Sequence, residues 1–124
     1  METIHIPPTP STPEIILDAT AGKISLLGRS IGPNAIPLFQ KIFSWMEEYF
    51  KEPKKNTIIE LKLEYFNSTS NKMIIDLLIL AKKLAGDKYS FSVNWLYETD
   101  DEDLLSQGKE IEHLWGIHFE YIPY

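Results

Sequence analysis

The sequence predicts an α/β fold, a compact two-layer domain in which an opening β-hairpin is followed by alternating helices and strands. Two short apolar runs near the start, separated by a turn-rich connector, form the pattern of a hairpin. Strand and helix patterns then alternate, which favours parallel strands joined by right-handed crossovers. Polar residues alternate with apolar ones in these strands, so we expect a mixed sheet with helices mainly on one face.

The opening hairpin is expected to pair residues 14–17 with residues 24–27, across a connector over residues 18–23. The first helix follows, with Asn34 as its expected N-cap and Pro37 in its first turn, where a missing N–H is tolerated. Apolar residues three and four apart continue to Tyr49, and Pro53 stops the pattern. The proline-rich residues 1–13 are expected to be a linker-like segment.

The second half of the chain repeats this alternation. A strand over residues 57–66 leads into a helix over residues 70–85, and Gly86 suits the left-handed position after a helix. A further strand covers residues 89–97. An acidic turn then opens a third helix, where negative charge complements the helix dipole, and a terminal strand covers residues 117–122.

Composition narrows the classes of function. At 124 residues the chain, residues 1–124, fits the size of a single domain. It contains no cysteine, which excludes disulfides, thiolate metal sites and a cysteine nucleophile. The net charge of −6 argues against nucleic acid as a partner. No signal peptide and no run of about 18 apolar residues is apparent, so we expect a cytoplasmic protein without membrane insertion.

Three consecutive hydroxyl residues stand where the central strand gives way to the second helix. Ser68, Thr69 and Ser70 follow Asn67, and residues of these types satisfy the free N–H groups at the start of a helix. The positive end of the helix dipole also favours an anion there. The hydroxyls are therefore helix caps, or one of them accepts a phosphate.

The second helix carries more apolar residues than one core-facing stripe needs. At 100° per residue the core stripe contains Ile74, Leu77, Leu78, Ala81 and Leu84. Ile75 and Ile79 fall outside it, near the polar Lys72 and Asp76. Either neighbouring helices bury these isoleucines, or the two form an exposed strip beside the hydroxyl cluster on which a partner docks.

Motifs over most of the chain resemble those of the SiaC-type bacterial regulatory phosphoproteins, a family of biofilm regulators. They are residues 11–15 (STPEI), 21–26 (AGKISL), 65–73 (YFNSTSNKM), 93–95 (VNW) and 98–103 (ETDDED). The predicted architecture is also similar to the STAS-like fold of anti-sigma-factor antagonists. The family resemblance implies a protein phosphorylated by a dedicated kinase and dephosphorylated by a PPM-type phosphatase. It also implies that the unmodified form binds and activates a diguanylate cyclase, which raises cyclic di-GMP.

Carried onto this sequence, the resemblance places the phosphoacceptor at Ser68, with Thr69 as the alternative. The implied role is a non-enzymatic switch in signal transduction that needs no cofactor and no metal. We expect the partner-binding surface to comprise Asn67, Ser68, Thr69, Ser70, Lys72, Ile75 and Ile79.

Two other functions compete with the cyclase-binding switch. One is a partner-switching protein of the anti-sigma-factor-antagonist type, which the STAS-like fold implies. The other is a small hydrolase with Ser68 as nucleophile, which would need a nearby base. The three histidines, His5, His113 and His118, stand in no catalytic motif, and no Gly-x-Ser-x-Gly elbow occurs. The acidic residues 100–103 lack the glycine-containing spacing of a calcium loop.

Overall fold

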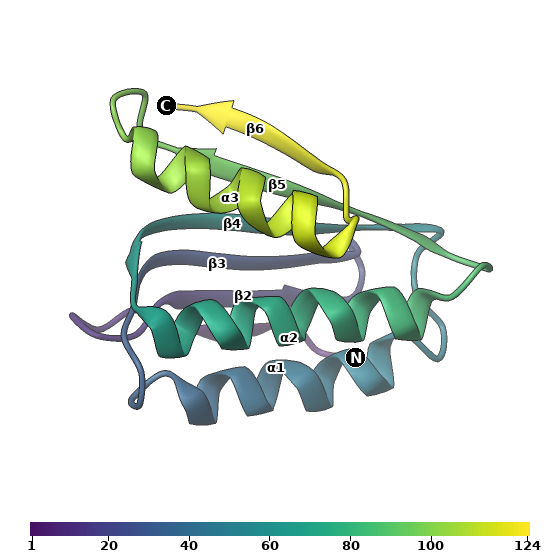
Figure 1. Cartoon of the computed structure of the whole chain (residues 1–124). Helices are drawn as coiled ribbons and strands as arrows, with labels where there is room; N and C mark the ends of the chain where they lie inside the picture. Colours follow the sequence, from purple (N-terminus) through teal and green to yellow (C-terminus); the bar gives the residue numbers. More distant parts are fainter.

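All three helices lie on one face of a single six-stranded sheet in the computed structural model, which describes residues 1–124 (Figure 1). The strands follow chain order across the sheet; β1, β2 and β3 are antiparallel neighbours, and β3 to β6 are parallel. This confirms the predicted two-layer α/β class. The elements are β1 (Ile4–Ile6), β2 (Glu14–Asp18), β3 (Lys23–Ser30), α1 (Ile36–Tyr49), β4 (Asn56–Phe66), α2 (Ser68–Ala85), β5 (Ser90–Tyr97), α3 (Glu102–Trp115) and β6 (Phe119–Pro123).

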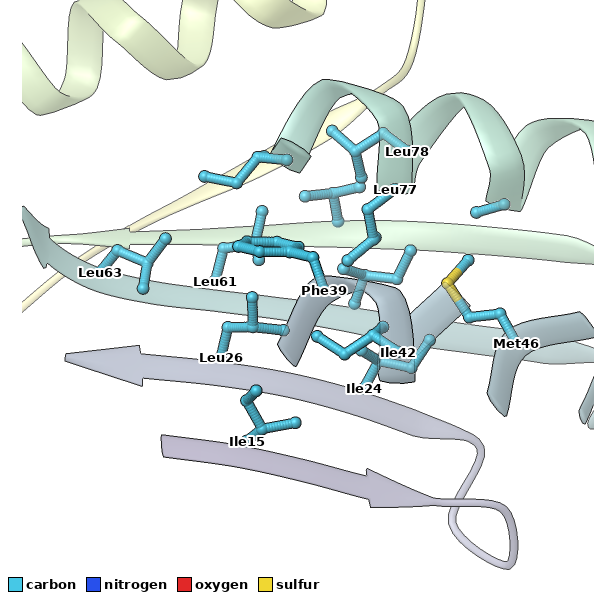
Figure 2. Packing of buried hydrophobic residues seen from close by; sticks show 14 of the residues in the cluster. Ile15, Ile24, Leu26, Phe39, Ile42, Met46, Leu61, Leu63, Leu77 and Leu78 are labelled. Carbon is cyan, nitrogen blue, oxygen red and sulfur yellow. The ribbon is translucent and has the colours of Figure 1, made fainter. Parts of the chain in front are cut away.

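The core fills the space between the sheet and the helix layer (Figure 2). Alternate strand residues such as Ile15, Leu26 and Leu61 are buried there, against Phe39 of α1 and Leu77 of α2. Burial of this apolar surface is the main force that fixes the helices on the sheet. None of the helices is both long and apolar enough to cross a membrane.

The opposite face of the sheet carries no helix (Figure 1), and the polar residues of the alternating strands point to it. Glu60 of β4 is in register with Asn94 of β5, and both are half-buried there. The Nζ atom of Lys23 lies 3.3 Å from the Glu60 carboxylate. The strict alternation of these strands thus corresponds to one packed face and one wetter face.

The first residues are not simply a linker, because Ile4–Ile6 forms the edge strand β1. It pairs antiparallel with β2, with Ile4 opposite Leu17 and Ile6 opposite Ile15. The His5 Nε2 atom also lies 2.7 Å from a Glu14 carboxylate oxygen. A three-residue strand is too short to show a recognisable alternation in the sequence. β1 forms because its backbone pairs with the edge of β2.

The expected N-cap of α1 is also corrected by the structure. Asn34 lies before the helix and donates a side-chain hydrogen bond to the Ser11 hydroxyl at 3.2 Å. Ala35 occupies the N-cap position and has no side-chain cap, whereas Pro37 lies in the first turn as expected. The Asn34 side chain therefore makes a long-range hydrogen bond in place of the capping bond that the local pattern predicts.

Candidate phosphorylation and partner-binding site

The carboxamide of Asn67 caps α2, and the hydroxyl residues that follow it do not. Its Oδ1 atom accepts a hydrogen bond from the Ser70 N–H at 3.0 Å, and its backbone is extended. The helix consequently begins at Ser68, two residues earlier than the sequence pattern predicts. Ser68 and Thr69 are thus helical residues of the first turn, and their hydroxyls are not committed to capping.

Asn67 also joins the start of α2 to the loop before α1. Its Nδ2 donates to the Gly32 carbonyl at 2.9 Å, and the Gly32 N–H donates back to Oδ1 at 3.1 Å. Its own backbone N–H donates to the carbonyl of Ser30, the last residue of β3, at 3.3 Å. This set of bonds fixes the position of the first turn relative to the sheet. The side chain of Asn67 is therefore an anchor for the site.

The three adjacent hydroxyls have different surroundings. Ser70 is fully buried and accepts a hydrogen bond from the Ser30 hydroxyl at 2.9 Å. Thr69 is half-buried against Gly32: a methyl group built on Gly32 would come within 2.3 Å of the threonine Cγ2. Only Ser68 is exposed. Ser70 is thereby removed from the expected contact surface, because its position in the core leaves nothing for a partner to reach.

Ser68 lies at one end of a hollow of about 280 Å³ between α2 and α3. From α2 the hollow is lined by Ser68, Asn71 and Ile75. The residues that line it from α3 were not expected from the sequence; they are Gln107, Glu110, Ile111 and Leu114. The hollow therefore combines apolar walls with one carboxylate, that of Glu110.

Exposed apolar side chains extend from this hollow on both helices. Ile79 lies one turn beyond Ile75 on α2 and is 38 % exposed, whereas Ile75 is half-buried at the hollow. On α3, Leu114 at the hollow is 63 % exposed, whereas Trp115, which is 43 % exposed, is not among the residues that line the hollow. We call three of these residues, Ile75, Ile79 and Leu114, the apolar surface. The buried residues of α3 are Leu104, Gly108 and Ile111, and the adjacent apolar pair Leu114 and Trp115 is not among them. This pair was the sequence feature that could have indicated exposed apolar surface on α3.

Lys72, one helical turn beyond Ser68, forms an exposed ion pair. Its Nζ lies 2.9 Å from an Asp76 carboxylate oxygen, and the two side chains are 74 % and 40 % exposed. Pairs this accessible to water contribute little to stability. Lys72 is the nearest cation along α2 to the Ser68 hydroxyl.

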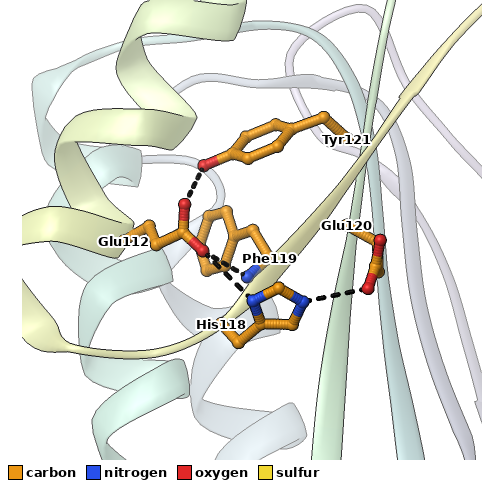
Figure 3. Close-up of polar contacts among 5 residues, drawn as sticks. All are labelled: Glu112, His118, Phe119, Glu120 and Tyr121. Carbon is orange, nitrogen blue, oxygen red and sulfur yellow. Dashed lines mark hydrogen bonds and ion pairs between the residues drawn. The ribbon is translucent and has the colours of Figure 1, made fainter.

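A cluster around Glu112 holds the C-terminal part of α3 against β6, and so fixes one wall of the hollow (Figure 3). Its carboxylate accepts hydrogen bonds from the Phe119 N–H and the Tyr121 hydroxyl, both at 2.8 Å. The Phe119 N–H, more than any other contact, lowers the pKa of Glu112. Burial and the Glu112 hydrogen bond raise the pKa of Tyr121. The exposed His118 is hydrogen-bonded to Glu120 of β6, and this bond raises the pKa of the histidine. His118 does not line the hollow.

Comparisons with known proteins agree with this architecture. The chain is 31 % identical over 110 residues to an uncharacterized protein of Pseudomonas aeruginosa strain UCBPP-PA14, with 89 % of this chain and 87 % of the relative covered. It superposes on the crystal structure of apo-SiaC from P. aeruginosa with a TM-score of 0.86 at 29 % identity, covering 98 % of this chain and 99 % of the other.

A second solved structure connects this fold with a partner. A chain of the crystal structure of diguanylate cyclase SiaD in complex with its activator SiaC, also from P. aeruginosa, matches with a TM-score of 0.88 at 28 % identity. The match covers 98 % of this chain and 99 % of that chain. Residues 6–124 match the family model described as SiaC family regulatory phosphoprotein, and this chain therefore belongs to the SiaC family.

Proposed function

We propose that this chain is a non-enzymatic phosphorylation switch in which Ser68 is the acceptor and the α2–α3 hollow is the docking site. In this proposal the unmodified form binds and activates a diguanylate cyclase in the cytoplasm. A dedicated kinase adds the phosphate and a PPM-type phosphatase removes it. Membership of a family of regulatory phosphoproteins supports the general role, and the solved complex of a relative with a cyclase supports the output.

The observation that carries the proposal is the exposure of Ser68 beside the hollow. Of its two neighbours, Ser70 is fully buried with its hydroxyl bonded to that of Ser30, and Thr69 is half-buried with its Cγ2 and Cβ atoms against Gly32. A kinase can reach the Ser68 hydroxyl without unfolding the first turn of α2. The phosphate would also lie at the positive end of an 18-residue helix, where an anion is favoured.

The lining of the hollow supports a phosphate that blocks docking. Phosphorylation adds a charge of about −1.5 to −2 at neutral pH. A partner that fills the hollow with apolar side chains against Ile75 and Leu114 would have to remove water from that phosphate. Glu110 in the same hollow adds a charge of the same sign, so the hollow itself offers the phosphate no cation.

The same lining favours an acceptor over a nucleophile at Ser68. The polar side chains that line the hollow with it are amides and one carboxylate, from Asn67, Asn71, Gln107 and Glu110. A serine nucleophile of the common type needs an imidazole within hydrogen-bond reach, and His118 is held at β6. Among binding partners, the solved cyclase complex favours a cyclase over the anti-sigma factor that a STAS-like fold implies.

Binding of variants to the diguanylate cyclase encoded in the same genome tests the proposal. We expect Ser68→Ala to bind as the unmodified protein does, and Ser68→Asp to bind at least tenfold more weakly. Thr69→Ser, which retains a hydroxyl next to the acceptor, is the matched control. Phosphopeptide mass spectrometry of protein from its native cell identifies the modified residue. Equal binding by the alanine and aspartate variants, together with no phosphate on Ser68, would contradict the proposal.

A further inference from the structure

The ion pair between Lys72 and Asp76 is weak, so Lys72 can exchange Asp76 for a stronger anion. In pairs four residues apart on a helix, the favourable order places the acid N-terminal to the base, and here the base comes first. Lys72 also lies near the positive end of the helix dipole, which disfavours a cation. Exposure of both side chains weakens the pair further.

We infer that a phosphate on Ser68 takes Lys72 from Asp76, and thereby changes the charge next to the apolar surface at a point beyond the modified residue. This inference depends on the proposed function for the presence of the phosphate. Ser68 precedes Lys72 by four residues, so the new pair has the acid N-terminal to the base. The phosphate also carries up to twice the charge of a carboxylate and offers three acceptor oxygens.

The charges on the neighbouring helix favour the same exchange. Glu110 of α3 lines the hollow together with Ser68 and repels a phosphate that turns inward. Lys72 and Asp76 are the charged residues of α2 nearest to the acceptor along the chain, and Lys72 is the cation among them. The phosphate is consequently directed along the outer surface of α2, toward the Lys72 ammonium.

The exchange leaves the Asp76 carboxylate without its cation. Asp76 is eight residues beyond Ser68, roughly 12 Å along the helix axis. Three residues further is the exposed Ile79, which is close enough on the helix surface to be its neighbour. A partner that covers Ile79 would then have to cover an unpaired carboxylate as well. Phosphorylation at the start of α2 thus disfavours docking at a point that the phosphate does not touch.

Phosphorus NMR of protein with phosphoserine installed at position 68 during translation tests this exchange. The second ionisation of phosphoserine normally occurs near pH 6, and a neighbouring ammonium lowers it. We expect Lys72→Gln to raise the midpoint of the phosphorus titration by about half a pH unit, and Lys72→Arg to restore it. Asp76→Asn, which releases the lysine, is expected to lower the midpoint. Lys83→Gln, a charge change in the last turn of α2, is the matched control and is expected to leave the midpoint unchanged.

Two results would overturn the inference: a midpoint that Lys72→Gln and Lys83→Gln move equally, or one that Asp76→Asn does not move. The circular dichroism of each variant verifies that α2 is intact, as expected for replacements of exposed side chains. The test is independent of whether Ser68 is the natural acceptor, since the phosphate is introduced synthetically. Absence of phosphate on Ser68 in the native cell would therefore refute the proposed function, whereas an unresponsive titration would refute only the exchange.

Discussion

Replacement of Asn67 by alanine should destabilise the whole domain, because one carboxamide anchors both the start of α2 and the loop before α1. The change removes the N-cap acceptor for the Ser70 N–H, which contributes about 1 kcal/mol. It also removes both hydrogen bonds to Gly32, at about 1 kcal/mol each. Partial exposure of Asn67 allows water to replace some of these contacts. We therefore expect a loss of about 2–3 kcal/mol in the free energy of unfolding.

Urea denaturation followed by far-UV circular dichroism measures this loss. For a domain of this size it corresponds to a decrease of about 1 M or more in the midpoint urea concentration. Asn71→Ala is the matched control, because Asn71 lies one turn further along α2 and its side chain forms none of the hydrogen bonds that the Asn67 side chain forms. Asn67→Asp retains the cap acceptor but lacks the donor to the Gly32 carbonyl, so its stability should fall between those of the other two. A loss below about 0.5 kcal/mol for Asn67→Ala would refute the anchoring role.

Three further predictions concern the walls of the site. Gly32→Ala would bring a methyl group within 2.3 Å of the Thr69 Cγ2, so we expect a loss of about 1–3 kcal/mol by thermal unfolding, partly recovered by adding Thr69→Ser. The contacts that lower the pKa of Glu112 stabilise the fold above its ordinary value of 4.5, and this stability is lost as the pH falls below it. Glu112→Gln should therefore be less stable than the wild type at pH 7 and more nearly equal to it at pH 3. Leu114→Ser changes a residue that is 63 % exposed, so it should weaken cyclase binding by tenfold or more while unfolding at nearly the wild-type temperature. Equal cyclase binding by this variant would argue against the hollow as the docking site.

Elements with a long repeating pattern were predictable from sequence, since their signal is local. The alternation over residues 57–66 corresponds to β4 (Asn56–Phe66), and the pattern over residues 89–97 corresponds to β5 (Ser90–Tyr97). β1 was missed because a three-residue strand forms only through pairing with β2. β3 was expected to end at residue 27 but continues to Ser30, after a register shift following Gly28, whose φ is +103°. Its extension matters because it brings Ser30 to the start of α2.

Sequence patterns indicated the candidate site only where one segment of the chain supplies it. Position 68 stands in a recognisable hydroxyl cluster, and Ile79 stands outside the core stripe of its own helix. Assignment of roles within the cluster required contacts that are distant in sequence, such as those of Ser70 with Ser30 and of Asn67 with Gly32. The α3 wall of the hollow depends on how two helices pack, which no local pattern specifies.

The same distant contacts give a physical reason for choosing between the two candidates for phosphorylation, Ser68 and Thr69. The Cγ2 and Cβ atoms of Thr69 pack against Gly32 without space for a further methyl group, so a phosphate on this side chain would have to be accommodated with little freedom to move. Any movement of Thr69 against Gly32 would disturb the loop that Asn67 holds, and with it the start of the helix. Ser68 precedes Thr69 by one position, which is a rotation of about 100° on the helix, and this rotation turns it away from the loop. The anchor therefore fixes the first turn on one side, while it leaves a free hydroxyl on the other side, at the hollow between α2 and α3.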